Sequence, residues 1–404
     1  MSWQRNLIAL WFAEFTAIFG FSFGFPFLSI YLHEDLGITD QHELALWTGT
    51  AIGIAGLSMA VVSPIWGLLA DRYGRRPMLL RSMLGGAVTV GLIGLSQSAI
   101  QVVGLRFMQG ATSGTVTAAN SLVVAETPRD RLGYAIGVLN SAVAIAGALS
   151  PLIGGLAVRV FGVRNIFLVA GALLLISVVP VLWVVRERPH RVRSSQRPPT
   201  LATIRAAGPG TLRSLVVLLV AQALMQFAFT STQVLIVLRL IRIDPVHAGT
   251  FTGAAFAMAG IGTTIAAIGY SKVGRRTGYL RLSGVAAVLL GVAILGLALA
   301  PSAESLIVGL ALAGLLYGVL NPSLGSMLGL EAPAQVQSTI FGFNASALAV
   351  GSAIGPFATG YVASISDPRY GLLLAAVASI SLGVLVRFKG REPVLERPAL
   401  VSRA

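Results

Sequence analysis

Glu14 and Arg106 are the two ionisable side chains that lie deep inside long apolar stretches of the sequence. An ionised carboxylate in lipid is strongly unfavourable, so Glu14 must either face an aqueous cavity or hold a proton part of the time. A carboxyl group that alternates between these states can exchange a proton for a cationic molecule. We therefore predict that Glu14 and Arg106 serve proton coupling. The sequence does not decide whether the two side chains form a salt bridge. The alternatives are a glutamate that only lines a vestibule and an arginine that only bonds carbonyls of the first span.

A second set of charged residues lies in the short polar segments that separate the apolar stretches. Asp71 is followed four residues later by Arg75, and Glu126 ends another apolar stretch. A carboxylate at a helix end can bind the positive N-terminal end of a neighbouring helix, whose amides lack partners. We predict that these three residues form an ionic latch, and that Arg275 with Glu331 forms a weaker second one. The alternative is that the basic residues only anchor a loop.

The composition indicates that these residues are positioned by membrane-spanning segments. Hydrophobic residues make up 55% of the 404 residues, charged residues make up 11%, and the mean hydropathy is +0.82. A soluble protein could not keep its surface wet with so few charges. One span needs about 20 apolar residues, which leaves room for about twelve spans. The predicted spans are 7–32, 44–70, 77–97, 99–125, 133–158, 164–185, 214–238, 247–270, 279–300, 303–330, 336–363 and 369–388.

The distribution of Lys and Arg predicts the orientation of these spans. Backbone polar groups in lipid must be satisfied within the segment, so the spans are helices and the protein is an all-α integral membrane protein. With the N-terminus in the cytoplasm, 23 of the 29 Lys and Arg residues lie on the cytoplasmic side, five lie outside and one lies in a span. Cytoplasmic loops are enriched in positive residues, so both termini are predicted to be cytoplasmic. The net charge of +14 follows from these loops and does not indicate nucleic-acid binding.

The chain contains an internal repeat at about half its length. The loop Gly67–Pro77 contains Gly-Arg-Arg, and Gly-Arg-Arg recurs at 274–276 between apolar stretches. Glu126–Pro128 and Glu331–Pro333 are 205 residues apart. This repeat predicts two pseudo-symmetric bundles of six helices, with the substrate site at their interface near the middle of the membrane. The predicted organisation is an N-terminal half at 1–185, a basic cytoplasmic linker at 186–213 and a C-terminal half at 214–404.

Three of these segments resemble motifs of the major facilitator superfamily. Gly67–Pro77 resembles the signature between its helices 2 and 3, and Leu105–Gly110 resembles its helix-4 arginine motif. Gly147–Gly155 resembles the helix-5 motif of its antiporters. With twelve spans and the repeat, the resemblance covers essentially the whole chain and implies the fold of that superfamily.

Within this superfamily, the stretch from Trp47 to Ser82 looks like bacterial multidrug efflux proteins of the drug–proton antiporter branch. Two positions depart from the family pattern. The helix-5 motif usually has glycine before its proline, where this chain has Ser150. The second-half loop has Ser271 where the first has Asp71, so any role of that aspartate exists in one half only.

The resemblance also implies roles for several charged residues. It places Asp71 against the start of helix 11, so that the latch closes the cytoplasmic side and favours the outward-open state. It links Arg106 to proton transfer. Some drug–proton antiporters of the superfamily carry an acidic residue in helix 1, which supports a coupling role for Glu14.

Polar and aromatic residues within the spans are candidates for the substrate cavity, because polar side chains tend to face the interior of the bundle. For any single aromatic ring, packing against lipid or another helix is the alternative. The cavity candidates are Phe15, Phe19, Asn140, Gln222, Gln226, Tyr317, Asn321 and Asn344. The matched glycines and prolines of helices 5 and 11 are predicted to make close helix contacts that still permit rocking. These are Gly147, Pro151, Gly155, Gly355 and Pro356.

Other chemistry is not expected from this sequence. There are no cysteines, and the four histidines lie in loops without the spacing of a zinc site, so no metal is predicted. A phosphate-binding G-x-x-x-x-G-K-[S/T] loop is also missing, so ATP is not expected to drive transport. Since no nucleophile, base and acid come together in the spans, we expect neither an enzyme nor a cofactor, and the proton gradient as the energy source.

The sequence therefore predicts a secondary transporter that exports small lipophilic or cationic compounds in exchange for protons. Its expected partners are a small-molecule substrate, protons and the lipid bilayer, and we expect a monomer. The excess of Arg over Lys points to a GC-rich bacterial genome, and the resemblance to bacterial efflux proteins implies the cytoplasmic (inner) membrane. The alternative is a carrier of the same superfamily for a sugar or another small metabolite, by symport or facilitated diffusion. A sensor or scaffold without transport is a less favoured reading.

Overall fold

The computed structural model describes residues 3–128, 131–187, 210–333 and 336–392, and all regular structure in these ranges is helical. The first half contains α1 (Trp3–Gly24), η1 (Phe25–Phe27), α2 (Leu28–Glu34), α3 (Gln41–Tyr73), α4 (Arg75–Ile93), α5 (Ala99–Thr112), α6 (Thr115–Glu126), α7 (Leu132–Phe161) and α8 (Val163–Trp183). The second half contains α10 (Thr211–Ile243), α11 (Ala248–Thr277), α12 (Tyr279–Leu299), α13 (Ala303–Glu331), α14 (Gln337–Ile365) and α15 (Pro368–Lys389). Most of the predicted linker, 188–209, lies outside the described residues.

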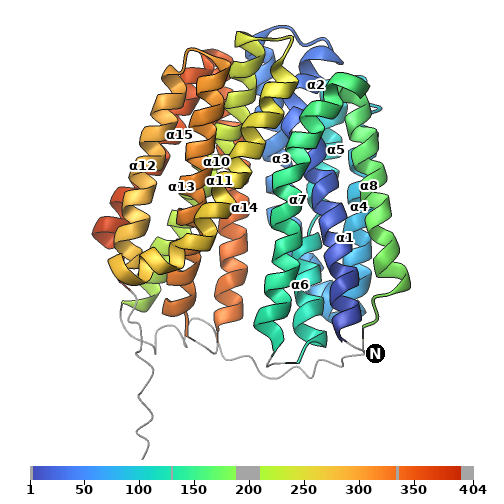
Figure 1. The fold of residues 1–404 in the computed structure, drawn as a ribbon, viewed down its shortest axis with the longest axis vertical. Coiled ribbons are helices and arrows are strands. Elements are labelled where there is room, and N and C mark those ends of the chain that lie inside the picture. Colours follow the sequence, from blue (N-terminus) through green and yellow to red (C-terminus); the bar gives the residue numbers. More distant parts are fainter. Residues whose placement is uncertain (1–2, 129–130, 188–209, 334–335, 393–404) are drawn as a thin grey trace, which may run out of the picture.

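The two halves stand side by side, and their helices run roughly parallel to one another (Figure 1). We call the end of the bundle at which α1 begins the lower end, as drawn in Figure 1, and the opposite end the upper end. Ten helices of the described part are long and apolar enough to cross a membrane. The two remaining predicted spans correspond to α4 and to the pair α5 and α6. These two short helices have 14 and 12 residues, and together they replace the single helix predicted over 99–125.

The break in this span has a local cause. Between α5 and α6 lie Ser113 and Gly114, and Gly114 has φ +123°, a backbone angle that a residue with a side chain rarely adopts. The free carbonyl of Ser113 accepts a hydrogen bond from Nη2 of Arg81 at 3.2 Å. Arg81 in turn lies over the ring of Trp66, with Cζ 3.6 Å from the ring centroid. The break is therefore stabilised by neighbouring helices, which the sequence pattern of one segment does not reveal.

The halves meet along two helix pairs, α3 with α14 and α7 with α11. A methyl group added at Gly49 would lie 2.5 Å from the carbonyl oxygen of Pro356, and one at Gly155 would lie 2.8 Å from Cα of Gly253. Both contacts lie toward the upper end, because α3 and α11 begin there and α7 and α14 end there. At the same end, Nδ1 of His42 lies 2.8 Å from the carbonyl oxygen of Ser364 in the other half. The two halves are therefore closed against each other at the upper end.

Candidate functional site

A cavity of about 1000 Å³ lies between the halves. Its wall is built from α1, η1, α2, α3, α5 and α7 of the first half and from α10, α11 and α13 of the second. The lining extends to Gly137, near the lower start of α7, and to Ile268, near the lower end of α11. Because the close contacts between the halves lie toward the upper end, the cavity faces the lower end.

Arg106 is the one side chain with a full charge among the described residues that line this cavity. Its Nε donates to the carbonyl oxygen of Ala51 on α3 at 3.0 Å, and its Nη1 donates to Oε1 of Gln109 at 2.5 Å. Its Cζ lies 4.3 Å from the ring centroid of Phe25. The sequence left open a structural arginine bonded to carbonyls of the first span, but the bonded carbonyl belongs to α3. The guanidinium is thus held in place by two helices and a ring.

The second-half wall of the cavity has an aromatic centre. The ring of Tyr317 on α13 stacks on Phe229 of α10, with centroids 3.9 Å apart and planes 11° apart. The Tyr317 hydroxyl donates to Oε1 of Gln226 at 3.0 Å, which fixes the ring. A stacked pair whose polar tip is already bonded presents a flat apolar surface, which suits a planar lipophilic ligand.

Glu14 does not line the cavity in this conformation. Its side chain is completely buried, and neither carboxylate oxygen has a hydrogen-bond partner among the described residues. The alternative of a glutamate that only lines an aqueous vestibule does not hold for this state, because Glu14 lies on the buried face of α1. An unpaired buried carboxylate is far more costly than a neutral carboxyl group, so we expect Glu14 to hold a proton here. Glu14 and Arg106 form no salt bridge, and the Arg106 contacts described above belong to other residues.

The remaining cavity candidates fall into two groups. Asn140 and Tyr317 line the cavity, and Gln226 lies directly behind Tyr317. The others are not among its lining residues, so their prediction as cavity walls is wrong for this state. They are Phe15, Phe19, Gln222, Asn321 and Asn344.

Phe15 and Phe19 are displaced from the cavity by a ladder of rings along α1. The ladder runs Trp11, Phe15, Phe19 and Phe23, with centroids 5.4, 5.8 and 5.7 Å apart. Rings spaced by one helical turn stack on one another, and this is the packing alternative that the sequence left open.

The predicted helix-contact residues differ in what they touch. Gly155 and the carbonyl of Pro151 approach Gly253 across the half interface. The carbonyl of Pro356 approaches Gly49, also across that interface. Gly355 instead packs on α10 within its own half. Gly147 makes no close helix contact, because no atom lies within 4 Å of a methyl group placed there, and it lines the cavity instead.

The predicted latch residues lie at the lower end. Arg75 is the first residue of α4, Glu126 ends α6 and Glu331 ends α13. The side chains of Asp71 and Arg275 lie outside the described part of the chain. The latch therefore stays a prediction.

Two carboxylates that the sequence analysis missed cap helices at the lower end of each half. Glu187 accepts hydrogen bonds from the backbone amides of Arg75 and Arg76, both at 2.9 Å. Glu392 accepts them from Tyr279 and Leu280, at 2.7 and 2.8 Å. Each caps a helix that follows a glycine with positive φ, where the first amides have no partner in the helix. Arg-Glu occurs at 186–187 and again 205 residues later, and this repeat could have identified both capping residues from the sequence.

Removing either cap is expected to lower stability without altering the cavity. Glu187→Gln and Glu392→Gln each replace two charge-assisted hydrogen bonds by a weaker contact, at a cost of about 1 kcal/mol. The two sites share no contact, so the double variant is expected to show the sum of the two effects. Thermal unfolding of the purified variants in detergent measures this. A double variant no less stable than either single one would contradict independent caps.

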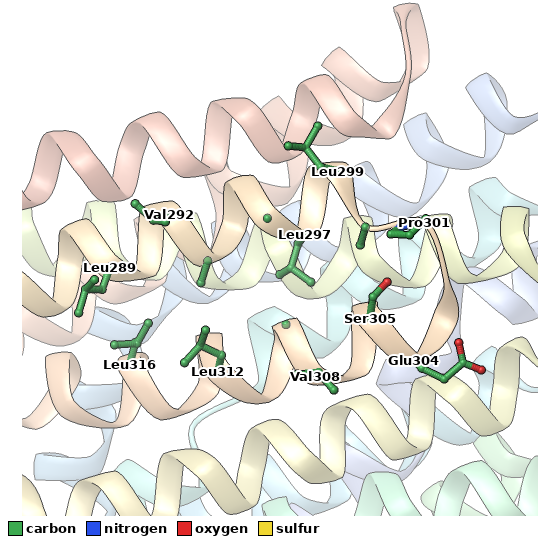
Figure 2. A pocket seen from close by; sticks show the side chains of 14 residues that line it. Leu289, Val292, Leu297, Leu299, Pro301, Glu304, Ser305, Val308, Leu312 and Leu316 are labelled. Atoms are coloured by element: carbon green, nitrogen blue, oxygen red, sulfur yellow. The ribbon is translucent and has the colours of Figure 1, made fainter.

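A second hollow lies on the flank of the second half, between α12 and α13, and has a volume of about 770 Å³. Figure 2 shows that its side chains come from these two helices and the turn that joins them, with Glu304 at one end. Its wall is otherwise aliphatic or small, as in Leu289 and Val308. It shares no lining residue with the cavity between the halves.

Comparison with known proteins agrees with this architecture. The sequence model of the Major Facilitator Superfamily matches residues 10–276 and 218–403. The Multidrug resistance protein MdtG of Dickeya zeae is 33% identical over 359 residues, which cover 88% of this chain and 87% of that protein. The protein of the same name from Citrobacter koseri is 30% identical, covering 96% and 93%.

Solved structures show the same fold at low sequence identity. A crystal structure of a mutant nucleoside transporter NupG has a TM-score of 0.78 at 14% identity, covering 94% of this chain and 98% of that one. A bacterial homologue of the human lysosomal transporter Spinster, in an inward-facing and occupied conformation, has a TM-score of 0.75 at 16% identity, covering 94% and 95%.

Proposed function

The chain belongs to the Major Facilitator Superfamily, and from this premise we propose that it exports small lipophilic or cationic compounds in exchange for protons. The observation that carries the proposal is the cavity of about 1000 Å³ between the halves, which is large enough for drug-sized ligands. The names of the related multidrug resistance proteins support the same class of substrate.

The chemistry of the cavity wall favours lipophilic compounds over sugars. The hydroxyls of Thr230, Thr263 and Thr264 donate to backbone carbonyl oxygens at 2.6, 2.8 and 2.9 Å. The donor hydrogens of these three hydroxyls in the second-half wall are therefore already used, and the neighbouring Phe229 and Tyr317 present rings. A sugar carrier must replace the hydrogen bonds that the sugar makes with water, which this wall does poorly.

We infer that the lower end faces the cytoplasm of a bacterial cell, because the predicted cytoplasmic segments carry most of the Lys and Arg residues. The cavity then faces the cytoplasm, which is the side from which an exporter takes its substrate. Rocking of the halves about the cavity would close the lower end and open the upper one. One chain contains the whole cavity, so the proposed working unit is a monomer. The proposed energy source is the proton gradient, without a cofactor.

We propose that movement of α1 couples the proton to the substrate. In this mechanism the substrate does not displace the proton directly from the Glu14 carboxylate. Glu14 lies on the buried face of α1, while Phe21 and Ser22 of the same helix line the cavity. Loss of the proton would leave a charge that the packed first half cannot solvate, so α1 must repack to bring it to water. Such repacking would move the cavity wall and link the proton to the substrate.

Transport by purified protein in proteoliposomes tests the proposal. With an outward-directed proton gradient, we expect the lipophilic cation ethidium to accumulate in the lumen. A labelled hexose should not be transported. Collapse of the gradient by a protonophore should release the accumulated ethidium. Uptake of the hexose, with no response to lipophilic compounds, would instead support the metabolite carrier.

A further inference from the structure

A third hollow, of about 540 Å³, opens on the flank of the first half between α1 and α7. We call it the aromatic groove. It is lined by Trp3, Gln4, Leu7, Ile8, Trp11, Phe12, Tyr134 and Val138. Since α1 and α7 both begin at the lower end, the groove lies in the lower half of the bundle. Phe12 and Tyr134 are 55% and 66% exposed, so the groove is open at the surface that faces lipid.

A hydrogen bond joins the lining of the aromatic groove to the lining of the cavity between the halves. Trp11 lines the groove, and Ser141 lines the cavity. The indole Nε1 of Trp11 donates to Oγ of Ser141 at 3.0 Å, and this hydroxyl donates to the carbonyl oxygen of Val138 at 2.6 Å. Val138 lines the groove again. Trp11 and its hydrogen bond to Ser141 thus connect the linings of the two hollows, and we call this contact the partition.

The two helices are held more firmly above this partition. Oγ of Ser150 on α7 donates to the carbonyl oxygen of Phe19 on α1 at 2.7 Å. Higher up, a methyl group at Gly154 would lie 2.9 Å from the carbonyl oxygen of Phe23. Trp11 can therefore turn away from Ser141 while this upper contact keeps the two helices together.

The groove wall favours flat aromatic molecules. Four of its eight lining residues are aromatic, and none is charged. Trp11 continues into the ring ladder of α1, stacked on Phe15 with planes 6° apart. The hollow between α12 and α13 has no aromatic lining residue, so it suits a lipid acyl chain and not a ring system (Figure 2).

We propose that the aromatic groove binds planar aromatic lipophiles dissolved in the adjacent membrane layer, and that Trp11 gates their entry from it into the cavity. This entrance rests on the proposed function, because it supplies substrate to the exporter. A water-soluble substrate would still enter the cavity from the open lower end. The transport rate of a substrate should therefore depend on how strongly it partitions into the membrane, and not only on its size and charge.

A reversible seal tests the gate. The chain has no native cysteine, so Trp11→Cys with Val138→Cys, which both line the groove and not the cavity, can be joined by a short bifunctional methanethiosulfonate reagent without background. In proteoliposomes, sealing should slow transport of a lipophilic acridine dye about tenfold, as expected when stacking contacts and the entrance are lost. Relative to the same variant before cross-linking, transport of a water-soluble sulfonated acridine should change less than about twofold by the same reasoning, and reduction should restore the rate before cross-linking. Equal slowing of both dyes would overturn the gate.

Two further variants keep the test independent of folding and of transport. Leu297→Cys with Gly309→Cys, joined by the same reagent, is the matched control in the aliphatic hollow and should leave both rates unchanged. A photoreactive lipophilic acridine should label peptides within 3–12 and 134–138 of the native protein, and Phe12→Ala with Tyr134→Ala should abolish this labelling. Labelling of cavity peptides without labelling of these groove peptides would overturn the groove even if the protein transports both dyes. Failure of the native protein to move either dye, with groove labelling intact, would instead reject the proposed function.

Discussion

Glu14→Gln is expected to abolish proton-driven accumulation of substrate while leaving its downhill movement intact. Glutamine matches the neutral carboxyl group in size but cannot exchange a proton. Glu14 is completely buried without a hydrogen-bond partner in the described part of the chain, so a neutral amide of the same size should fit there at a small cost in stability. With one proton per substrate, the native protein should concentrate a neutral substrate about tenfold per unit of pH gradient, and the variant should not concentrate it at all.

The measurement is dye uptake into proteoliposomes, with and without a pH gradient, for native protein, Glu14→Gln and Glu14→Asp. Aspartate keeps a titratable group and should retain part of the accumulation. Thermal unfolding of the three proteins controls for folding. Full accumulation by Glu14→Gln would show that the proton travels elsewhere.

Gly49→Leu is expected to prevent closure of the upper end and to stop transport. Even a methyl group at Gly49 would lie 2.5 Å from the carbonyl oxygen of Pro356 and 2.9 Å from Cα of Gly360, so a leucine cannot fit in the closed state. Both obstructing atoms belong to the backbone of α14, which cannot move away without separating the halves. The variant should therefore populate the state that is open at the upper end.

Thiol labelling measures this shift, because a single introduced cysteine is the only thiol in the protein. With Ala353→Cys placed on α14 near Gly53, a membrane-impermeant maleimide should react faster in Gly49→Leu than in the parent. Gly104→Leu is the matched control, since no atom lies within 4 Å of a methyl group placed there. Normal transport by Gly49→Leu would contradict the role of this contact in closure.

The sequence predicted the fold because its signals are local and repeated. Three signals can be recognised segment by segment, without knowing how the helices pack: apolar stretches of span length, the bias of Lys and Arg, and the repeated motif of Gly67–Pro77. The all-α architecture of this superfamily is confirmed. The break at Gly114 was not predicted, because the residues that stabilise it belong to other helices.

The candidate site was predicted less completely, because lining a cavity depends on how each helix is rotated. Asn140 and Tyr317 line it, whereas Phe15 and Phe19 belong to the ring ladder of α1. The apolar sequence around Glu14 did not reveal which face of α1 packs inward. Depth in the membrane can be read from sequence position, but the direction of a side chain comes from helix packing.

Substrate-driven proton movement tests the central claim most directly. Proteoliposomes with an acidic interior and a lumenal pH indicator are mixed with ethidium, and the lumenal pH is followed for the native protein and for Glu14→Gln. Proton-coupled export through Glu14 predicts that ethidium accelerates alkalinisation of the lumen in the native protein and has no effect in the variant, although the variant still binds ethidium. Identical traces for the two proteins would contradict the account and favour a carrier that works without this carboxyl group.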